Sequence, residues 1–265
     1  MGREASLEAL ISQGLDTLGV DYSRQQTAQL ALYCSEILMW NPKLGLVELR
    51  GSSRNEMMSE LLERHVLDSL LGLPLVQRLI EDRRQATAGL QFDPGRPGSE
   101  DVSPSAEIVL MDVGSGAGFP GIPLAIFLGK QPGLKVVLVE RSGRRCGFLR
   151  NCQALLAKPG SGVSFEIRQE SLEDQALRSA DILTNRAFSP LTPDSFRAQS
   201  ALLKPGGFLA LYKARRESIN QEVGLLGKGV SDLGENLRVQ GDFTVWNLNS
   251  MGGERHILLW KNPGD

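Results

Sequence analysis

A glycine-rich turn after an apolar run is the feature of this 265-residue sequence that most constrains its fold. Residues 108–113 are apolar apart from Asp112. Glycines follow at Gly114, Gly116, Gly118 and Gly121. Glycine has no Cβ, so such a turn can bring backbone N–H groups against a ligand. We expect a helix to start near Phe119, with Pro120 in its first turn, where a missing N–H costs nothing. A purely structural turn needs fewer glycines, so the pattern predicts a loop that binds a nucleotide-type cofactor.

Strands and helices alternate along the chain from residue 107 onward. Seven runs have strand-like composition: 108–113, 135–140, 163–168, 180–185, 207–213, 243–248 and 255–260. Helical patterns separate the first five, which predicts a doubly wound parallel sheet with its ligand at the carboxyl ends of the strands. Only residues 249–253 separate the last two runs, so we expect an antiparallel hairpin at the sheet edge. The predicted fold class is α/β, with a seven-stranded, mostly parallel, Rossmann-like sheet.

The first 80 residues have helical periodicity and no strand-like alternation, so we expect an N-terminal helical extension over 1–80. Pro42 should end the second helix of this extension, because the residue before a proline avoids the helical region. Residues 81–106 are rich in proline, glycine and charge, and we expect a flexible insertion there. The sheet domain then spans 107–265.

Composition narrows the classes of function. A net charge of −2 argues against a protein that coats nucleic acid through its overall charge. A local basic surface is still compatible with this net charge. Three cysteines and two histidines make neither a disulfide framework nor a zinc set, so we expect no metal. We see no signal peptide and no apolar run of the roughly 18 residues that span a bilayer. We therefore expect a cytoplasmic protein without a membrane partner.

Two classes of cofactor compete for the glycine-rich turn. Residues 116–121 satisfy the Gly-x-Gly-x-x-Gly pattern of NAD or FAD sites, whereas 112–118 satisfy the acid-x-Gly-x-Gly-x-Gly pattern of S-adenosylmethionine sites. Glu140 ends the second strand, where a carboxylate can accept both ribose hydroxyls of either cofactor. The Leu-Lys-Pro-Gly-Gly turn at 203–207 and the edge hairpin are typical of methyltransferases. We therefore predict S-adenosyl-L-methionine as the cofactor.

Longer segments of the chain resemble a known family. The matching segments are 64–69, 112–123, 144–150, 185–188 and 253–256. The Phe-Pro-Gly-Ile-Pro continuation of the glycine-rich turn is the most specific of them. Together they are similar to the glucose-inhibited division protein B family, also called RsmG, of 16S rRNA guanine-N7 methyltransferases. The resemblance implies a monomer that transfers a methyl group from S-adenosyl-L-methionine to N7 of a guanine in 16S rRNA of the small ribosomal subunit.

The resemblance also implies which residues form the site. It assigns cofactor contacts to Gly114, Phe119, Leu172, Glu173 and Arg186, beside Glu140. Arg186 stands where donor and acceptor meet, and would bind the cofactor carboxylate or an RNA phosphate, or else form only a surface ion pair. For RNA we expect contacts from Lys213 and Arg215, which follow the fifth strand, and from His65.

Guanine N7 carries a lone pair and no proton at neutral pH, so its attack on a sulfonium methyl group needs positioning rather than a general base. The sequence shows no acid–base constellation, and we name no catalytic residue. His65, Asp68 and Ser69 share one helix face, but without a nucleophile elbow they do not indicate a hydrolase triad. His65 and Asp68 either fix their helix against the sheet or touch RNA. Two other functions stay open: methylation of another RNA or a small molecule, and a non-catalytic role as an rRNA-binding assembly factor.

Overall fold

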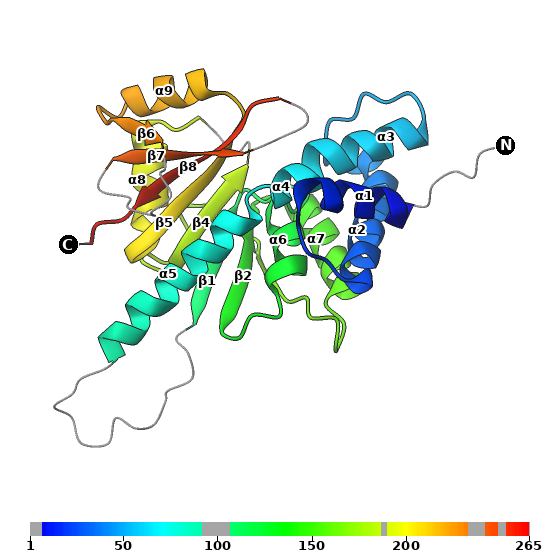
Figure 1. Cartoon of the computed structure of the whole chain (residues 1–265), viewed down its shortest axis with the longest axis horizontal. Helices are drawn as coiled ribbons and strands as arrows, with labels where there is room; N and C mark the ends of the chain where they lie inside the picture. The colour runs from blue at the N-terminus through cyan, green and yellow to red at the C-terminus, as the bar shows by residue number, and fades with distance from the viewer. Residues whose placement is uncertain (1–6, 92–106, 187–189, 233–241, 249–252, 265) are drawn as a thin grey trace.

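The protein is described here by a computed structural model that covers residues 7–91, 107–186, 190–232, 242–248 and 253–264. An eight-stranded sheet, in the order β3-β2-β1-β4-β5-β8-β7-β6, forms the centre of this part of the chain (Figure 1). The strands are β1 Ile108–Val113, β2 Leu134–Val139, β3 Glu166–Arg168, β4 Ala180–Arg186, β5 Leu203–Lys213, β6 Val230–Asp232, β7 Phe243–Leu248 and β8 Arg255–Lys261. All seven predicted strands are present, and the short β6 extends the sheet by one.

The direction of the strands confirms the predicted fold class. Strands β1 to β5 run parallel to one another. Strand β8 lies between β5 and β7 and is antiparallel to both. The last two strands therefore form the predicted antiparallel pair. Because β8 is antiparallel, its first residues lie at the carboxyl end of β5, where His256 pairs with Lys213.

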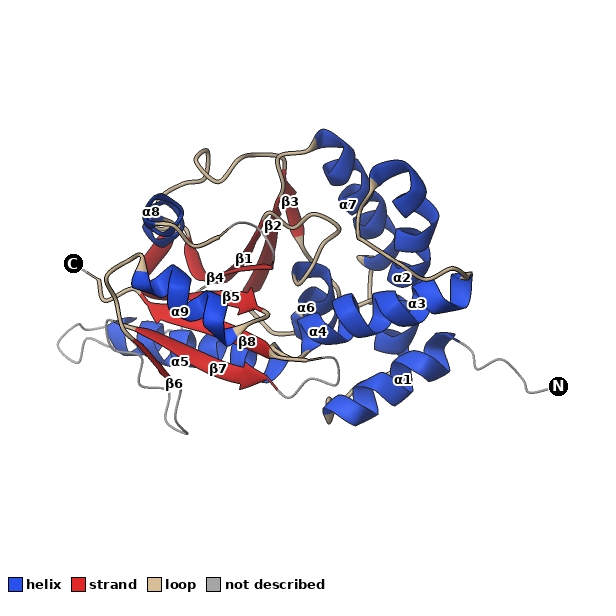
Figure 2. Ribbon diagram, turned by 90° about the horizontal axis from the view of Figure 1, so that it is seen from above, coloured by secondary structure: helices blue, strands red, loops and turns tan. Residues whose placement is uncertain are grey.

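Both faces of the sheet are covered by helices, which explains why strands such as β1 are buried throughout and apolar apart from Asp112. One face packs against α1 Leu7–Leu18, α2 Arg24–Leu44, α3 Arg54–Leu61, the π-helical segment η1 Leu62–Leu67, α4 Asp68–Leu70, α5 Leu73–Gln91, α6 Gly121–Leu128 and α7 Gly143–Leu156. The other face packs against α8 Pro193–Ala201 and α9 Arg216–Gly224 (Figure 2). Alternate residues along the central strands β1, β4 and β5 separate the two cores: Leu110, Ile182 and Phe208 point to the first, Met111, Leu183 and Leu209 to the second.

Helix α5 corrects the prediction of a flexible insertion at 81–106. Residues 81–91 continue this helix, and the rest of the predicted insertion lies outside the described residues. Leu79, Ile80 and Arg83 are buried. The charges that suggested a loop therefore belong to an amphipathic helix that lies across the sheet, with Glu81 on its outer face and Arg83 turned toward the sheet.

Two further expectations are wrong in detail. Helix α2 continues through Pro42 and ends at Leu44, where Gly45 adopts a φ of +55° and donates its N–H to the Asn41 carbonyl. A proline in the last turn removes only one hydrogen bond, so the left-handed glycine sets the end of the helix. No helix joins β3 to β4; residues 169–179 form a loop, which carries Leu172 and Glu173.

A buried ion cluster fixes α5 to the amino end of β4. The Asp181 carboxylate accepts hydrogen bonds from the Arg83 guanidinium at 3.0 and 3.1 Å and from the Lys204 ammonium at 2.6 Å. It also accepts the backbone N–H of Val109 in β1 at 2.9 Å. Arg83 reaches the Pro205 carbonyl as well, at 3.0 Å. The buried Asp181 carboxylate and Arg83 guanidinium are thus both paired, as buried charges require, while Lys204 stays partly exposed.

Replacing Arg83 by Ala should lower the free energy of unfolding by about 3–5 kcal/mol, because it leaves the Asp181 carboxylate buried without its main partner. Urea unfolding of wild type and variant measures the loss. Arg197→Ala is the control, since that side chain is 79% exposed and should change stability by less than about 0.5 kcal/mol. Equal losses for the two variants would contradict this account of the cluster.

Candidate active site

The glycine-rich turn follows β1 at the carboxyl edge of the sheet. Gly114, Gly116 and Gly118 adopt φ angles of +69°, +58° and +101°, which side chains other than glycine rarely allow. The turn is held from behind by Tyr33 of α2, whose hydroxyl donates to the Ala117 carbonyl at 2.7 Å. The helical extension therefore supports the loop directly.

Asp112, the acid of the motif, lies wholly buried beneath this turn. One carboxylate oxygen accepts the Gly121 N–H at 3.0 Å, which joins the end of β1 to the start of α6. Burial raises the pKa of Asp112 to about 7, although the Gly121 hydrogen bond opposes the rise. Asp112 thus shapes the loop from inside, whereas the ligand side of the turn is formed by backbone.

Glu140 presents a carboxylate beside the turn. Its two oxygens accept the N–H groups of Gly116 at 3.0 Å and of Ser142 at 2.8 Å. The residue is only 4% exposed, so the orientation of its carboxylate is fixed by these bonds. The bonds leave lone pairs on both oxygens, which fits the ribose hydroxyls for which Glu140 was predicted.

Two cavities meet at the glycine-rich turn, and Gly114 and Arg145 line both. The smaller cavity, of about 370 Å³, lies between β1, β2 and the loop after β3. The larger one, of about 550 Å³, lies between the turn, the ends of β4 and β5, and η1. We refer to them as the small and the large cavity.

All nine residues predicted for the site border these two cavities. Gly114, Glu140, Leu172 and Glu173 line the small cavity. Gly114, Phe119, Arg186, His65, Lys213 and Arg215 line the large one. A carboxylate-lined small cavity fits the hydroxyls and amino group of an adenosine, and a cationic large cavity fits a carboxylate or a phosphate. These residues can therefore hold the predicted cofactor, although their individual roles stay predictions.

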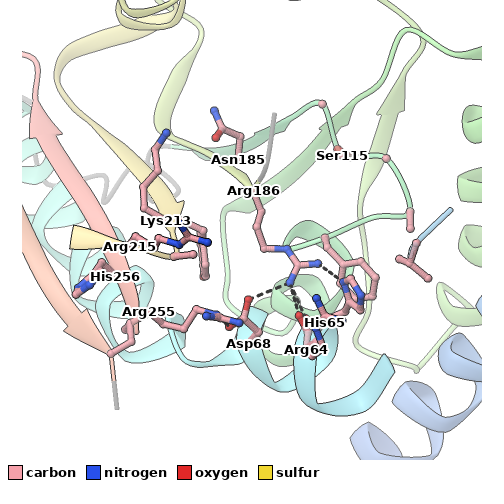
Figure 3. A pocket seen from close by; sticks show the side chains of 18 of the residues that line it. Arg64, His65, Asp68, Ser115, Asn185, Arg186, Lys213, Arg215, Arg255 and His256 are labelled. Atoms are coloured by element: carbon pink, nitrogen blue, oxygen red, sulfur yellow. Dashed lines mark hydrogen bonds and ion pairs between the residues drawn. The ribbon is translucent and has the colours of Figure 1, made fainter. Parts of the chain in front are cut away.

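Arg186 points from the end of β4 toward the helical extension (Figure 3). Its Nη1 donates to the Arg64 carbonyl at 3.0 Å and to the Asp68 carboxylate at 3.1 Å, and its Nη2 meets His65 Nδ1 at 2.8 Å. The guanidinium also stacks over the Phe119 ring, 4.8 Å from its centroid. The sequence allowed a surface ion pair for Arg186. The structure shows an ion pair with Asp68, but it lies largely buried in the wall of the large cavity.

His65 is a neutral side chain in this structure. Burial, together with the smaller effect of the positive charges of Arg186 and Arg64, lowers its pKa to about 4. Because a guanidinium can only donate, His65 Nδ1 must accept, and the proton of the neutral ring is on Nε2. His65 therefore brings no positive charge to RNA at neutral pH. It fixes η1 to the sheet through Arg186, which was one of the two roles considered for it.

The two cations predicted after β5 differ in their surroundings. The Lys213 ammonium lies 2.6 Å from the Glu222 carboxylate, which also accepts the Leu191 N–H at 2.9 Å. The ion pair of Lys213 with Glu222 thereby links β5 to α9. Arg215 is exposed at the start of α9, and across the described ranges its guanidinium has no partner. Arg215 is thus the cation that is most available to a phosphate.

Sequence reasoning missed Arg255 as a member of this site. Its Nε donates to Asp68, so one carboxylate joins Arg255 of β8 to Arg186 of β4 (Figure 3). The signal was present in the sequence, because an antiparallel last strand brings its first residues to the carboxyl edge of the sheet. Arg255 was noted only as part of a matching segment.

Comparisons with known proteins show the family of this chain. A family model described as rRNA small subunit methyltransferase G matches residues 99–225. The ribosomal RNA small subunit methyltransferase G of Treponema denticola is 30% identical to this chain, over 99% of this chain and 98% of that protein. The protein of the same name from Stenotrophomonas maltophilia strain K279a is also 30% identical, over 98% and 97% of the two chains. The chain belongs to this family.

Membership confirms the predicted resemblance and the predicted class of enzyme. The chain is a methyltransferase, and S-adenosyl-L-methionine is its methyl donor, as predicted from the turn at 203–207 and the terminal strand pair together with the glycine-rich turn. In the part of the chain that the structure describes, no helix is long and apolar enough to cross a membrane. The same ranges contain no cluster of three side chains suited to a metal ion.

Replacing Glu140 by Ala should weaken binding of S-adenosyl-L-methionine by about 1–3 kcal/mol, because two hydroxyls would lose their acceptor. Glu140→Gln keeps one acceptor oxygen and should lie between this variant and wild type. Isothermal titration calorimetry measures the affinities, with Asp194→Ala as the control because that side chain is 91% exposed on α8. Unchanged affinity in both Glu140 variants would remove this residue from the site.

Wild type should lose stability relative to His65→Gln as the pH falls. The folded protein binds a proton on His65 with a pKa of about 4, whereas the unfolded chain binds it near 6.5. Stability is therefore fully present above about pH 6.5 and falls by up to about 3 kcal/mol toward pH 4. Urea unfolding of both proteins at several pH values gives the difference, which would be independent of pH if the pKa of His65 were the same in the folded protein and in the unfolded chain.

Proposed function

We propose that this protein transfers the methyl group of S-adenosyl-L-methionine to N7 of a guanine in 16S rRNA of the small ribosomal subunit. The observation that carries the proposal is the large cavity, which opens beside Gly114 and has a cationic wall. Such a wall suits a nucleotide of an RNA chain, and the named relatives act on the RNA of the small subunit.

The residues of the two cavities have different roles in the reaction: those of the small cavity bind the cofactor, and those of the large cavity bind the acceptor base. S-adenosyl-L-methionine, when bound, supplies a methyl group on a positively charged sulfur. Glu140 binds the ribose and the glycine-rich turn binds the adjoining part of the molecule through backbone N–H groups. Phe119, Leu46 and Val47 line the large cavity with apolar surface, which limits water around the acceptor base.

No residue has to move a proton at N7. The N7 lone pair attacks directly, so the contribution of the protein is to align the base with the methyl group and to exclude water. This explains why the site holds no free acid–base pair. The His65 ring is occupied with Arg186, and Asp68 is occupied with Arg186 and Arg255.

The RNA backbone is bound by cations on the outer side of the large cavity. A shallower depression of about 790 Å³ adjoins it and shares Ala214, Arg215 and Arg255 with it. Arg215 and Arg255 thus lie between base and backbone.

We further propose a monomer that acts in the cytoplasm; the buried free thiols of Cys34, Cys146 and Cys152 support a reducing compartment.

A methylation assay tests the proposed function. The protein and labelled S-adenosyl-L-methionine are incubated with unmodified small-subunit RNA, and the label is mapped by N7-specific strand scission. Label at a single guanine N7 is the expected result. Label only in another RNA or in small metabolites would point to a different substrate, and cofactor binding without any transfer would point to an assembly factor.

Arg215→Ala should raise the Kd for RNA about three- to tenfold and reduce the slope of log K against log salt by about 1, because one phosphate contact is lost. Affinity for S-adenosyl-L-methionine should stay unchanged. Arg197→Ala on α8 is the matched control, since it removes an exposed arginine that lines neither the large cavity nor the depression beside it. Equal effects of the two variants would show general charge attraction rather than a defined contact.

A further inference from the structure

We propose that Asp68 is a positioning residue for the methyl transfer, acting through Arg186 and Arg255. Its carboxylate holds both guanidiniums in the wall of the large cavity and compensates their charge, so that the acceptor base can become positive. This inference rests on the proposed function, because it concerns the charge that guanine acquires there.

The geometry at Asp68 is that of a carboxylate shared between two strands of the sheet. One oxygen accepts from Arg186 Nη1 of β4 at 3.1 Å, and the other accepts from Arg255 Nε of β8. Asp68 itself comes from the helical extension, and its side chain is 11% exposed. Charge-assisted bonds of this kind are short and directional, so each guanidinium is held in one orientation.

The backbone of the extension is adapted to the same contact. Asp68 directly follows η1, a π-helical segment in which the ordinary hydrogen-bond ladder of an α-helix is interrupted. The Arg64 and His65 carbonyls of that segment accept from Arg186 Nη1, at 3.0 and 3.4 Å. Asp68 and the π-helical turn therefore bind one guanidinium together.

The side chains that line the large cavity carry an excess of positive charge, which Asp68 reduces. The cationic side chains that line it are Arg64, Arg145, Arg186, Lys213, Arg215 and Arg255. The carboxylates that line it are Asp68 and Glu222. Since Glu222 is occupied by Lys213, Asp68 is the carboxylate that compensates the two guanidiniums of β4 and β8.

The reaction makes this compensation important for the rate. A bond forms between N7 and the methyl carbon, the bond between that carbon and sulfur breaks, and its electron pair stays on sulfur. The positive charge thereby moves from the sulfur to the purine ring. Uncompensated guanidiniums beside the base oppose that charge, and a fixed carboxylate in a water-poor cavity offsets them.

The same sheet provides a matched control for a purely structural role. Asp181 is also a buried carboxylate that joins two cations, Arg83 and Lys204, but it lies at the amino end of β4 and lines neither cavity. Asp181→Asn should lower stability and leave the kcat of the folded enzyme unchanged. A structural role alone predicts the same behaviour for Asp68→Asn.

The experiment compares wild type, Asp68→Asn, Asp68→Glu and Asp181→Asn under conditions in which thermal unfolding shows each to be folded. For Asp68→Asn we expect kcat to fall about ten- to hundredfold. Affinity for S-adenosyl-L-methionine should stay within about twofold, and RNA should bind as tightly as to wild type or more tightly, because a negative charge is lost. Asp68→Glu, which keeps the charge, should restore part of kcat.

Three outcomes separate the inferences. An unchanged kcat in Asp68→Asn, with wild type active, overturns the role of Asp68 alone. Parallel losses of kcat, cofactor affinity and RNA affinity also overturn it, because they would show that the site has collapsed. If wild type itself places no methyl group on guanine N7, the proposed function fails, and the positioning role fails with it.

Discussion

The arrangement of this active site depends on the hydrogen bonds that the Arg186 guanidinium makes with the helical extension. The side chain extends from the last residue of β4, beside the glycine-rich turn, and ends among groups of the helical extension. The π-helical turn and the neutral His65 ring both face it, because a buried guanidinium needs several acceptors within reach. The helices before the sheet are therefore part of the active site rather than an appendage. They supply one wall of the large cavity and, through Tyr33, the support of the glycine-rich turn.

Two similar ion clusters lie at opposite ends of β4 and differ in their surroundings. At the amino end, Asp181 joins Arg83 and Lys204 in a region that borders neither cavity, so the cluster fixes α5 to the sheet. At the carboxyl end, Asp68 joins Arg186 and Arg255 beside the large cavity. The chemistry of the pairs is the same. Their position relative to the carboxyl edge of the strands decides which of them bears on the reaction.

Much of the fold follows from the order of residues along the chain. Alternation between two cores is visible in the central strands, and the glycine-rich turn, Glu140 and the antiparallel last pair are local signals that stay valid in the structure. The errors have a common cause. Residues 81–91 resemble a loop because their charges are numerous, and only the sheet on which α5 lies gives its apolar residues something to bury against. Pro42 resembles a helix end, yet Gly45 closes the helix.

The sequence by itself determined the class of sheet, the identity of the cofactor and the family, because these depend on short patterns whose backbone geometry is local. Only the tertiary structure decided what the charged side chains do. Asp68 is 118 residues from Arg186 and 187 residues from Arg255 along the chain, and no local rule pairs them. Their contact exists because β4 and β8 both present residues at the carboxyl edge of one sheet and the helical extension packs against that edge. Packing therefore brings Arg186, Arg255 and Asp68, which are far apart in the sequence, together as one ion cluster in the wall of the large cavity.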